Sequence, residues 1–129
     1  MKVLSLYQPY AQIIKSGIKK IETRSWKTNY RGKLYIHASM TKLKKEDKEN
    51  KKLMALVGDA DMDYGTIICE CDLVDCIEMT EDFIEQLKVN NPDEYNSGFY
   101  SPGRYAWILD NVKICDPIKA KGHLGIWNY

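Results

Sequence analysis

Residues 66–78 read TIICECDLVDCIE, and this run is the longest strand candidate in the chain. Apolar and polar side chains alternate along it, as they do in a strand with one buried face. The alternation slips near Leu73 and Val74, which indicates a β-bulge. The run is therefore predicted to be a long strand with one irregularity.

Shorter strands are predicted on both sides of this run. They cover residues 3–6, 21–26, 34–38, 104–109, 113–118 and 122–129, and a turn at Asp110 and Asn111 separates the fourth from the fifth. The strands are short and half-polar, and two connections lack a helix, which disfavours a parallel βαβ sheet. We predict an α+β fold, in which a curved, mostly antiparallel sheet closes into a β-barrel with helices on its rim.

Three helices are predicted between these strands. The first covers residues 9–16, because proline suits the first helical position, and Gly17 ends it as a left-handed cap. The second is a charged helix at residues 42–56, with a modest apolar stripe. The third covers residues 80–89, where Thr80 caps the start and Asn90-Asn91-Pro92 ends the helix.

Bulk composition indicates one globular domain over residues 1–129. The 129 residues are 44% hydrophobic and 29% charged, which excludes a disordered or fibrous chain. No apolar run approaches the ~20 residues of a membrane helix, and the first residues do not resemble a signal peptide. We therefore predict a cytoplasmic protein that does not bind membranes.

Four cysteines occur at positions 69, 71, 76 and 115, and none belongs to a C-x-x-C pair. Cys69 and Cys71 are two residues apart, so they share one face of the predicted strand. Buried, reduced thiols are favoured over a zinc site. No metal and no cofactor are predicted.

Positive charge is concentrated in one short stretch. Residues 15–33 hold seven basic side chains and one acid, a local charge of +6 in a chain whose net charge is +1. Local concentration of charge, rather than its total, creates a surface that attracts anions.

Residues 17–26, GIKKIETRSW, lie within this basic stretch and hold the main candidate site. In an extended chain Lys20, Glu22, Arg24 and Trp26 share one face, and Lys19 approaches it from the turn after Gly17. Arg24 offers a bidentate hydrogen-bond donor, Glu22 a carboxylate acceptor and Trp26 a ring for stacking. Lys19 adds an amine. The alternative is a surface strand in which Glu22 simply pairs with Arg24 or a lysine.

A second segment that could line a binding cleft beside residues 17–26 is SPGRYAW at residues 101–107. Its Tyr105 and Trp107 face either this cleft or the core. Arg31 in the turn at residues 30–32 is a further candidate for phosphate. His37 lies in a strand pattern and is predicted to be structural. Phosphate-loop, dinucleotide, nucleophile-elbow and zinc-protease motifs are all missing from the sequence.

These segments resemble the ASCH domain, the activating signal cointegrator homology domain, which is a relative of the PUA RNA-binding domains. The resemblance rests on LSLYQPY (4–10), GIKKIETRSW (17–26) and YRGKLYIHA (30–38), with weaker likeness at residues 72–76 and 121–127. It implies a PUA-like β-barrel and a cleft that binds RNA, single-stranded DNA or a nucleotide. Lys19, Glu22, Arg24, Trp26, Arg31, Tyr105 and Trp107 are the predicted ligand-binding residues.

Two alternatives remain open at this point. One small bacterial branch of the superfamily hydrolyses N4-acetylcytidine with a lysine, a threonine three residues later and a distant glutamate. The lysine matches Lys19, but Glu22 stands at the threonine position, and Glu81, Glu85 and Glu94 all qualify as the glutamate. In an enzyme Lys19 and Glu22 would be catalytic; the other alternative is a protein-interaction module of a translation or transcription assembly.

Overall fold

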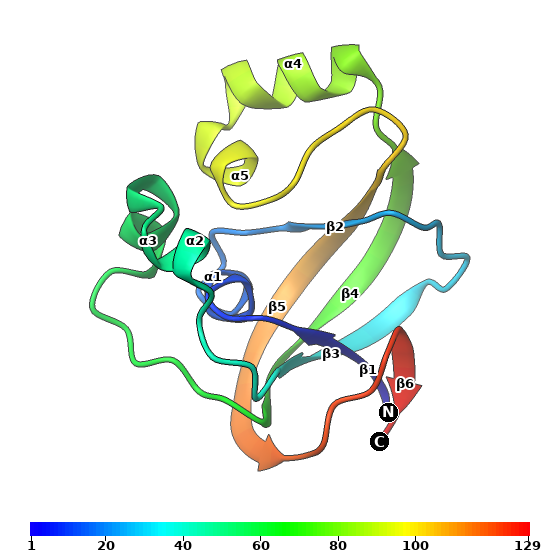
Figure 1. Cartoon of the computed structure of the whole chain (residues 1–129). Helices are drawn as coiled ribbons and strands as arrows, with labels where there is room; N and C mark the ends of the chain where they lie inside the picture. The colour runs from blue at the N-terminus through cyan, green and yellow to red at the C-terminus, as the bar shows by residue number, and fades with distance from the viewer.

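The centre of the molecule is a single six-stranded sheet, seen in a computed structural model that describes residues 1–129 (Figure 1). The strands are β1 (Lys2–Leu6), β2 (Ile21–Arg24), β3 (Gly32–Ala38), β4 (Thr66–Glu78), β5 (Tyr105–Lys119) and β6 (Ile126–Asn128). Their order is β2-β5-β4-β3-β1-β6, and every neighbouring pair except β1 and β3 is antiparallel. The prediction of a mostly antiparallel α+β fold is confirmed.

The sheet curls into a half-barrel whose two edges are β2 and β6 (Figure 1). The helices are α1 (Tyr10–Lys15), α2 (Lys45–Lys48), α3 (Lys51–Val57), α4 (Glu81–Asn90) and α5 (Pro92–Asn96). In Figure 1, α4 and α5 lie together beyond β2, while α2 and α3 lie together at another side of the molecule. Helices therefore lie along two sides of the curled sheet (Figure 1), which agrees with the predicted helices on its rim.

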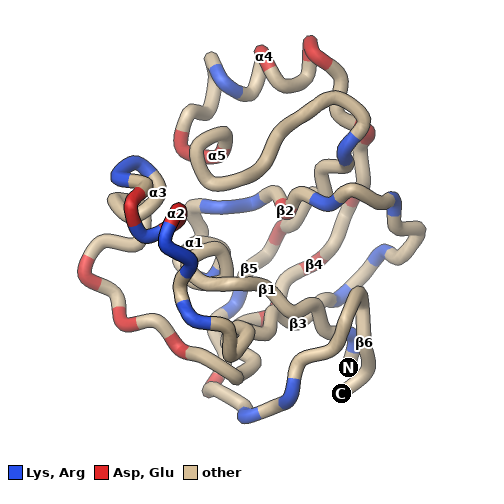
Figure 2. Tube along the Cα trace, viewed as in Figure 1, with Lys and Arg blue, Asp and Glu red and all other residues tan.

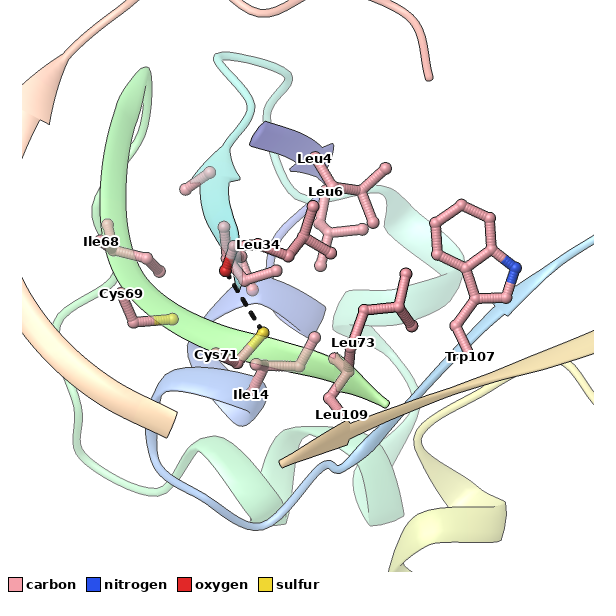
Figure 3. Close-up of a cluster of buried hydrophobic side chains, with 13 residues drawn as sticks. Leu4, Leu6, Ile14, Leu34, Ile68, Cys69, Cys71, Leu73, Trp107 and Leu109 are labelled. Atoms are coloured by element: carbon pink, nitrogen blue, oxygen red, sulfur yellow. Dashed lines mark hydrogen bonds between the residues drawn. The ribbon is translucent and has the colours of Figure 1, made fainter. Parts of the chain in front are cut away.

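A cluster of 13 buried side chains fills the hollow of the sheet (Figure 3). Ala11 and Ile14 of α1 pack there against residues from β1, β3, β4 and β5. Trp107 of β5 lies at one end of the cluster, next to β2, and is fully buried. Burying each large apolar side chain contributes roughly 1.5–3 kcal/mol, so this cluster is a main source of stability.

The long strand at residues 66–78 is confirmed as β4, with the predicted bounds. Its pairing with β5 shifts register between Leu73 and Asp75, where the sequence predicted a bulge. A bulge inserts an unpaired residue and bends the strand. β4 and β5 therefore stay paired while they curl.

The predicted turn at Asp110 and Asn111 is wrong, because β5 continues through it to Lys119. Asn111 adopts a positive φ of 54°, and its Nδ2 donates to Asp72 Oδ2 of β4 at 2.9 Å. The pairing with β4 shifts at this point. Asparagine tolerates the left-handed region, so the chain forms a bulge inside one strand instead of reversing.

The helix predicted at residues 42–56 is two short helices, α2 and α3. Asn50 separates them, and its Oδ1 accepts from Leu53 N at 3.1 Å as the N-cap of α3. The same capping occurs after α4, where Asn91 Oδ1 accepts from Glu94 N at 3.2 Å. Pro92 was predicted only to end a helix, yet it also starts α5, because proline fits a first helical turn.

Cys69 and Cys71 are buried in β4, as predicted, whereas Cys76 and Cys115 are half-buried. Burial disfavours the thiolate and raises the pKa of Cys69 and of Cys71 to about 12. None of the helices has both the length and the apolar character needed to cross a bilayer.

Candidate functional site

The turn between α1 and β2 directs Lys19 into the molecule. Gly17 has a φ of +87°, a conformation that glycine adopts without steric cost, and its amide donates to Ile14 O at 3.0 Å. The amide of Lys19 then donates to Ile13 O at 3.1 Å. The side chain of Lys19 is consequently only 1% exposed.

Lys19 reaches the segment around α5 with its ammonium group. Nζ donates to Ser97 O at 2.6 Å and lies 4.0 Å from Glu94 Oε2. Burial lowers the pKa of Lys19, against the opposing effect of the Glu22 and Glu94 carboxylates. An ammonium group has three donors, and Ser97 O is its one hydrogen-bond acceptor in the protein, so Lys19 can donate to a ligand.

Glu94 fixes the start of β2. Its side chain is 2% exposed, and its carboxylate accepts from Lys20 N at 2.7 Å and from Ile21 N at 3.3 Å. Burial raises the pKa of Glu94, which Lys19 and the two backbone amides oppose. Of the three glutamates that the sequence left open, Glu94 is the one beside Lys19, whereas Glu81 and Glu85 are exposed on α4.

Glu22 and Arg24 form an ion pair on one face of β2. Arg24 Nε donates to Glu22 Oε2 at 2.9 Å, and Arg24 Nη2 donates to Ser5 O of β1 at 3.2 Å. Glu22 is buried at 7% exposure. The sequence left open whether Glu22 belongs to a site or only pairs with Arg24; the pair exists, and both residues line the cavity described below.

Trp26 covers the buried Trp107. The two rings meet edge to face, with centroids 4.8 Å apart at 89°, and Trp107 Nε1 donates to Trp26 O at 3.3 Å. Trp26 itself remains 40% exposed. It therefore presents an apolar ring to solvent on a rigid support.

A cavity of about 1020 Å³ lies over these residues. Its five cationic side chains are Lys19, Arg24, Lys44, Arg104 and Lys121, and its three carboxylates are Glu22, Glu46 and Asp47. Its aromatic side chains are Tyr7, Tyr10, Trp26, Phe99, His37 and His123. The walls thus come from β1, α1, β2, β3 and α2 and from the segments at residues 25–26, 39–44, 97–104 and 121–125.

Four of the seven predicted ligand residues line this cavity, namely Lys19, Glu22, Arg24 and Trp26. The other three, and the neighbouring Lys20, lie outside its walls. Arg31 Nη2 is 3.8 Å from Asp75 Oδ1, on a different part of the surface. Trp107 pairs opposite Glu22 across the sheet, but Trp26 covers it, and Tyr105 packs against the core.

His37 has a structural role, as the sequence predicted. Its Nδ1 lies 3.0 Å from Ser5 Oγ, and its Nε2 lies 2.7 Å from Ala120 O. Ser5 Oγ also accepts from Trp127 Nε1 at 3.0 Å. The ring thereby ties β3 to β1 and to the segment before β6, although part of it borders the cavity.

The sequence indicated residues 101–107 as a second wall, and Arg104 of that segment does line the cavity, but the sequence did not indicate Ser97, Gly98 and Phe99. Gly98 packs closely against its neighbours in this segment, because a Cβ atom at this position would lie 3.3 Å from Lys19 Nζ and 2.8 Å from the ring of Tyr100. Phe99 N donates to Thr23 Oγ1 at 3.3 Å, which joins the segment to β2. Asn91 and Pro92 mark the start of α5 and were the one local clue to the part of this wall at residues 97–99.

Comparison with known proteins places this arrangement in a family. The sequence profile of the ASCH domain matches residues 4–119. Human activating signal cointegrator 1 is 32% identical over 132 residues, covering 96% of this chain and 21% of the relative. The mouse protein of the same name is 35% identical over 92 residues, covering 64% of this chain and 15% of the relative. The chain spans about a fifth of the length of these relatives.

Solved structures show the same fold at lower identity. The ASCH protein of Zymomonas mobilis superposes with a TM-score of 0.56 at 17% identity, covering 92% of this chain and 72% of that chain. A point mutant of that protein gives a TM-score of 0.55 at 17% identity, over 92% and 74%. With the profile match over nearly the whole chain, this protein belongs to the ASCH domain family, which is PUA-like.

Proposed function

We propose that the cavity binds RNA, another single-stranded nucleic acid or a nucleotide. The observation that carries this proposal is the position of Lys19. Its side chain is 1% exposed yet borders the cavity, which Glu22 also lines. Two of the three donors of the Lys19 ammonium have no hydrogen-bond acceptor in the protein, and leaving buried donors unpaired is costly, whereas the edge of a nucleobase offers acceptors.

The remaining walls match the other parts of a nucleotide. Trp26 offers a supported ring for stacking, and base stacking on an aromatic side chain contributes roughly 1–3 kcal/mol. Arg24 offers donors to a phosphate or a base edge. Glu22 accepts from an exocyclic amine.

Family membership supports the same ligand class. PUA-like domains are generally RNA-binding, and this chain belongs to a PUA-like family. The proposed partner is therefore nucleic acid or a nucleotide, not a membrane. Four unpaired cysteines fit the reducing cytoplasm, where such ligands are found.

Titration of fluorescent RNA and DNA hexamers against the protein at several salt concentrations tests the proposal. Binding is expected to weaken with salt, with a slope near −0.7 for each neutralised phosphate of a single strand. Arg24→Ala is expected to weaken binding and flatten the slope. Arg31→Ala is the matched control, because Arg31 lies outside the cavity. Equal losses in both variants, or no binding by either hexamer, would contradict the proposal.

A second function, hydrolysis of an N4-acylated cytidine, is favoured by one observation. Burial lowers the pKa of Lys19, which increases the fraction of its amine that is unprotonated and able to accept a proton, and Glu94 holds it in place. Lys19 would take a proton from water as the oxygen adds to the acyl carbon, with Glu22 orienting the water. Cleavage of the C–N bond returns the proton to the leaving amine and releases cytidine and a carboxylic acid.

Incubation with N4-acetylcytidine, followed by chromatography, tests this second function. Release of cytidine that Lys19→Met abolishes would establish an amidohydrolase. If the wild-type protein releases none while it binds the nucleoside, the site is a binding site only.

A further inference from the structure

Two cation–aromatic pairs lie in the walls of the cavity, beyond the residues used so far. Lys44 Nζ lies 4.4 Å from the centre of the Tyr7 ring, and Arg104 Cζ lies 4.4 Å from the centre of the Phe99 ring. All four residues line the cavity. Tyr7 is 46% exposed and Phe99 is 65% exposed, so both rings are open to solvent.

The two pairs come from different parts of the fold. Tyr7 follows β1 and Lys44 precedes α2, whereas Phe99 and Arg104 belong to the segment between α5 and β5. Figure 1 shows β2 running between these two parts, and Figure 2 shows basic residues in each of them. β2 carries Glu22 and Arg24, which we propose to contact a base edge. These two residues therefore have one cation–aromatic pair on each side.

Each pair offers what one nucleotide needs. An exposed ring gives a stacking surface for a base, and the cation that lies over the ring gives a counter-charge for a phosphate. A free nucleoside has no phosphate, and a mononucleotide has no neighbouring base, so neither uses both pairs. An internal nucleotide of a strand has a phosphate and a base on each side.

We infer that the cavity accepts the base of an internal nucleotide of a single strand of RNA or DNA. The base enters toward Lys19 and Glu22, and its two neighbours contact the Tyr7–Lys44 and Phe99–Arg104 pairs. This inference rests on the proposed function and narrows its ligand from nucleotides in general to a strand of at least three nucleotides.

Affinity measured against ligand length tests the inference. The probes are an equal mixture of the four 5′-mononucleotides, a mixed-sequence trinucleotide and a mixed-sequence hexanucleotide, each as RNA and as DNA. We expect the trinucleotide to bind at least about tenfold more tightly than the mononucleotides, because each stacked neighbour adds roughly that factor. The double variant Tyr7→Ala/Phe99→Ala is expected to lose most of this gain.

A matched control is the double variant Val89→Ala/Tyr129→Ala, which removes two exposed apolar side chains outside the cavity and should keep the full gain. Comparison of the RNA and DNA probes identifies the type of strand. Mononucleotides that bind as tightly as the trinucleotide would overturn this inference while leaving the proposed function intact. Failure of all probes to bind would instead overturn the proposed function itself.

Discussion

Lys19 and Glu94 meet at 4.0 Å between Nζ and Oε2, and both side chains are almost completely buried, at 1% and 2% exposure. The contact joins the start of β2 to α5, two segments far apart in the chain. Glu94 also accepts from two backbone amides of the segment that leads into β2. The same carboxylate therefore supports the fold and positions the amine of the candidate site.

Replacing Glu94 is expected to destabilise the protein. Glu94→Ala leaves Lys19 as an unpaired buried charge, a change that typically costs about 3–5 kcal/mol. Glu94→Gln should cost less, because its amide oxygen still accepts from Lys20 N. Urea unfolding measures both values, and Glu85→Ala on the exposed face of α4 is the control, expected within ±0.5 kcal/mol of the wild type. Wild-type stability of Glu94→Ala would contradict the role of this contact.

Glu22→Gln separates recognition from charge balance. The variant keeps the volume and one acceptor of Glu22 but removes the charge that pairs with Arg24. If Glu22 accepts from a base amine, affinity for the preferred nucleotide should fall by roughly 1–3 kcal/mol. Calorimetric titration measures the affinity, and a thermal melt is recorded in parallel. A lower melting temperature with unchanged affinity would show that Glu22 is only structural.

Trp26→Ala is expected to weaken nucleic-acid binding by roughly 1–3 kcal/mol, the contribution of one stacked base. The loss of stability should be small, because Trp26 is 40% exposed while Trp107 beneath it remains in the core. Anisotropy titration with an RNA hexamer measures the first effect, and Val89→Ala serves as the control for removing an exposed apolar group. Unchanged affinity would remove Trp26 from the site.

The sequence predicted the structural features that depend on residues close together in the chain. The alternation of residues 66–78 set the bounds of β4, and Gly17 predicted the turn that directs Lys19 inward. What it missed depends on contacts between distant segments. Glu94 is identified by its hydrogen bonds to Lys20 and Ile21, and Trp107 is hidden by Trp26. The short helices α3 and α5 each begin at an asparagine cap, Asn50 and Asn91, and the periodicity of apolar residues did not reveal these caps.

Alkaline pH is expected to destabilise the protein through the buried thiols. Burial raises the pKa of Cys71 to about 12 from the ordinary 9.0. Between these values the folded state keeps a proton that the unfolded state releases, so the free energy of unfolding falls as pH rises, by up to about 1.4 kcal/mol per pH unit. Urea unfolding between pH 9 and 11 should give a shallower slope for Cys71→Ala. Ile67→Val, a core change without a titrating group, should keep the wild-type slope; equal slopes in all three proteins would contradict this account.

The central claim is that a nucleic-acid ligand enters the cavity above Lys19. Backbone amide shifts in an NMR titration with a mixed-sequence RNA hexamer test it most directly. The account predicts that the largest changes fall on Glu22, Arg24 and Trp26 of the β2 segment and on Gly98 and Phe99 opposite, all of which line the cavity. Changes confined to the hollow over β3, β4 and β5 around Lys33 and Lys113, or no changes at all, would contradict it.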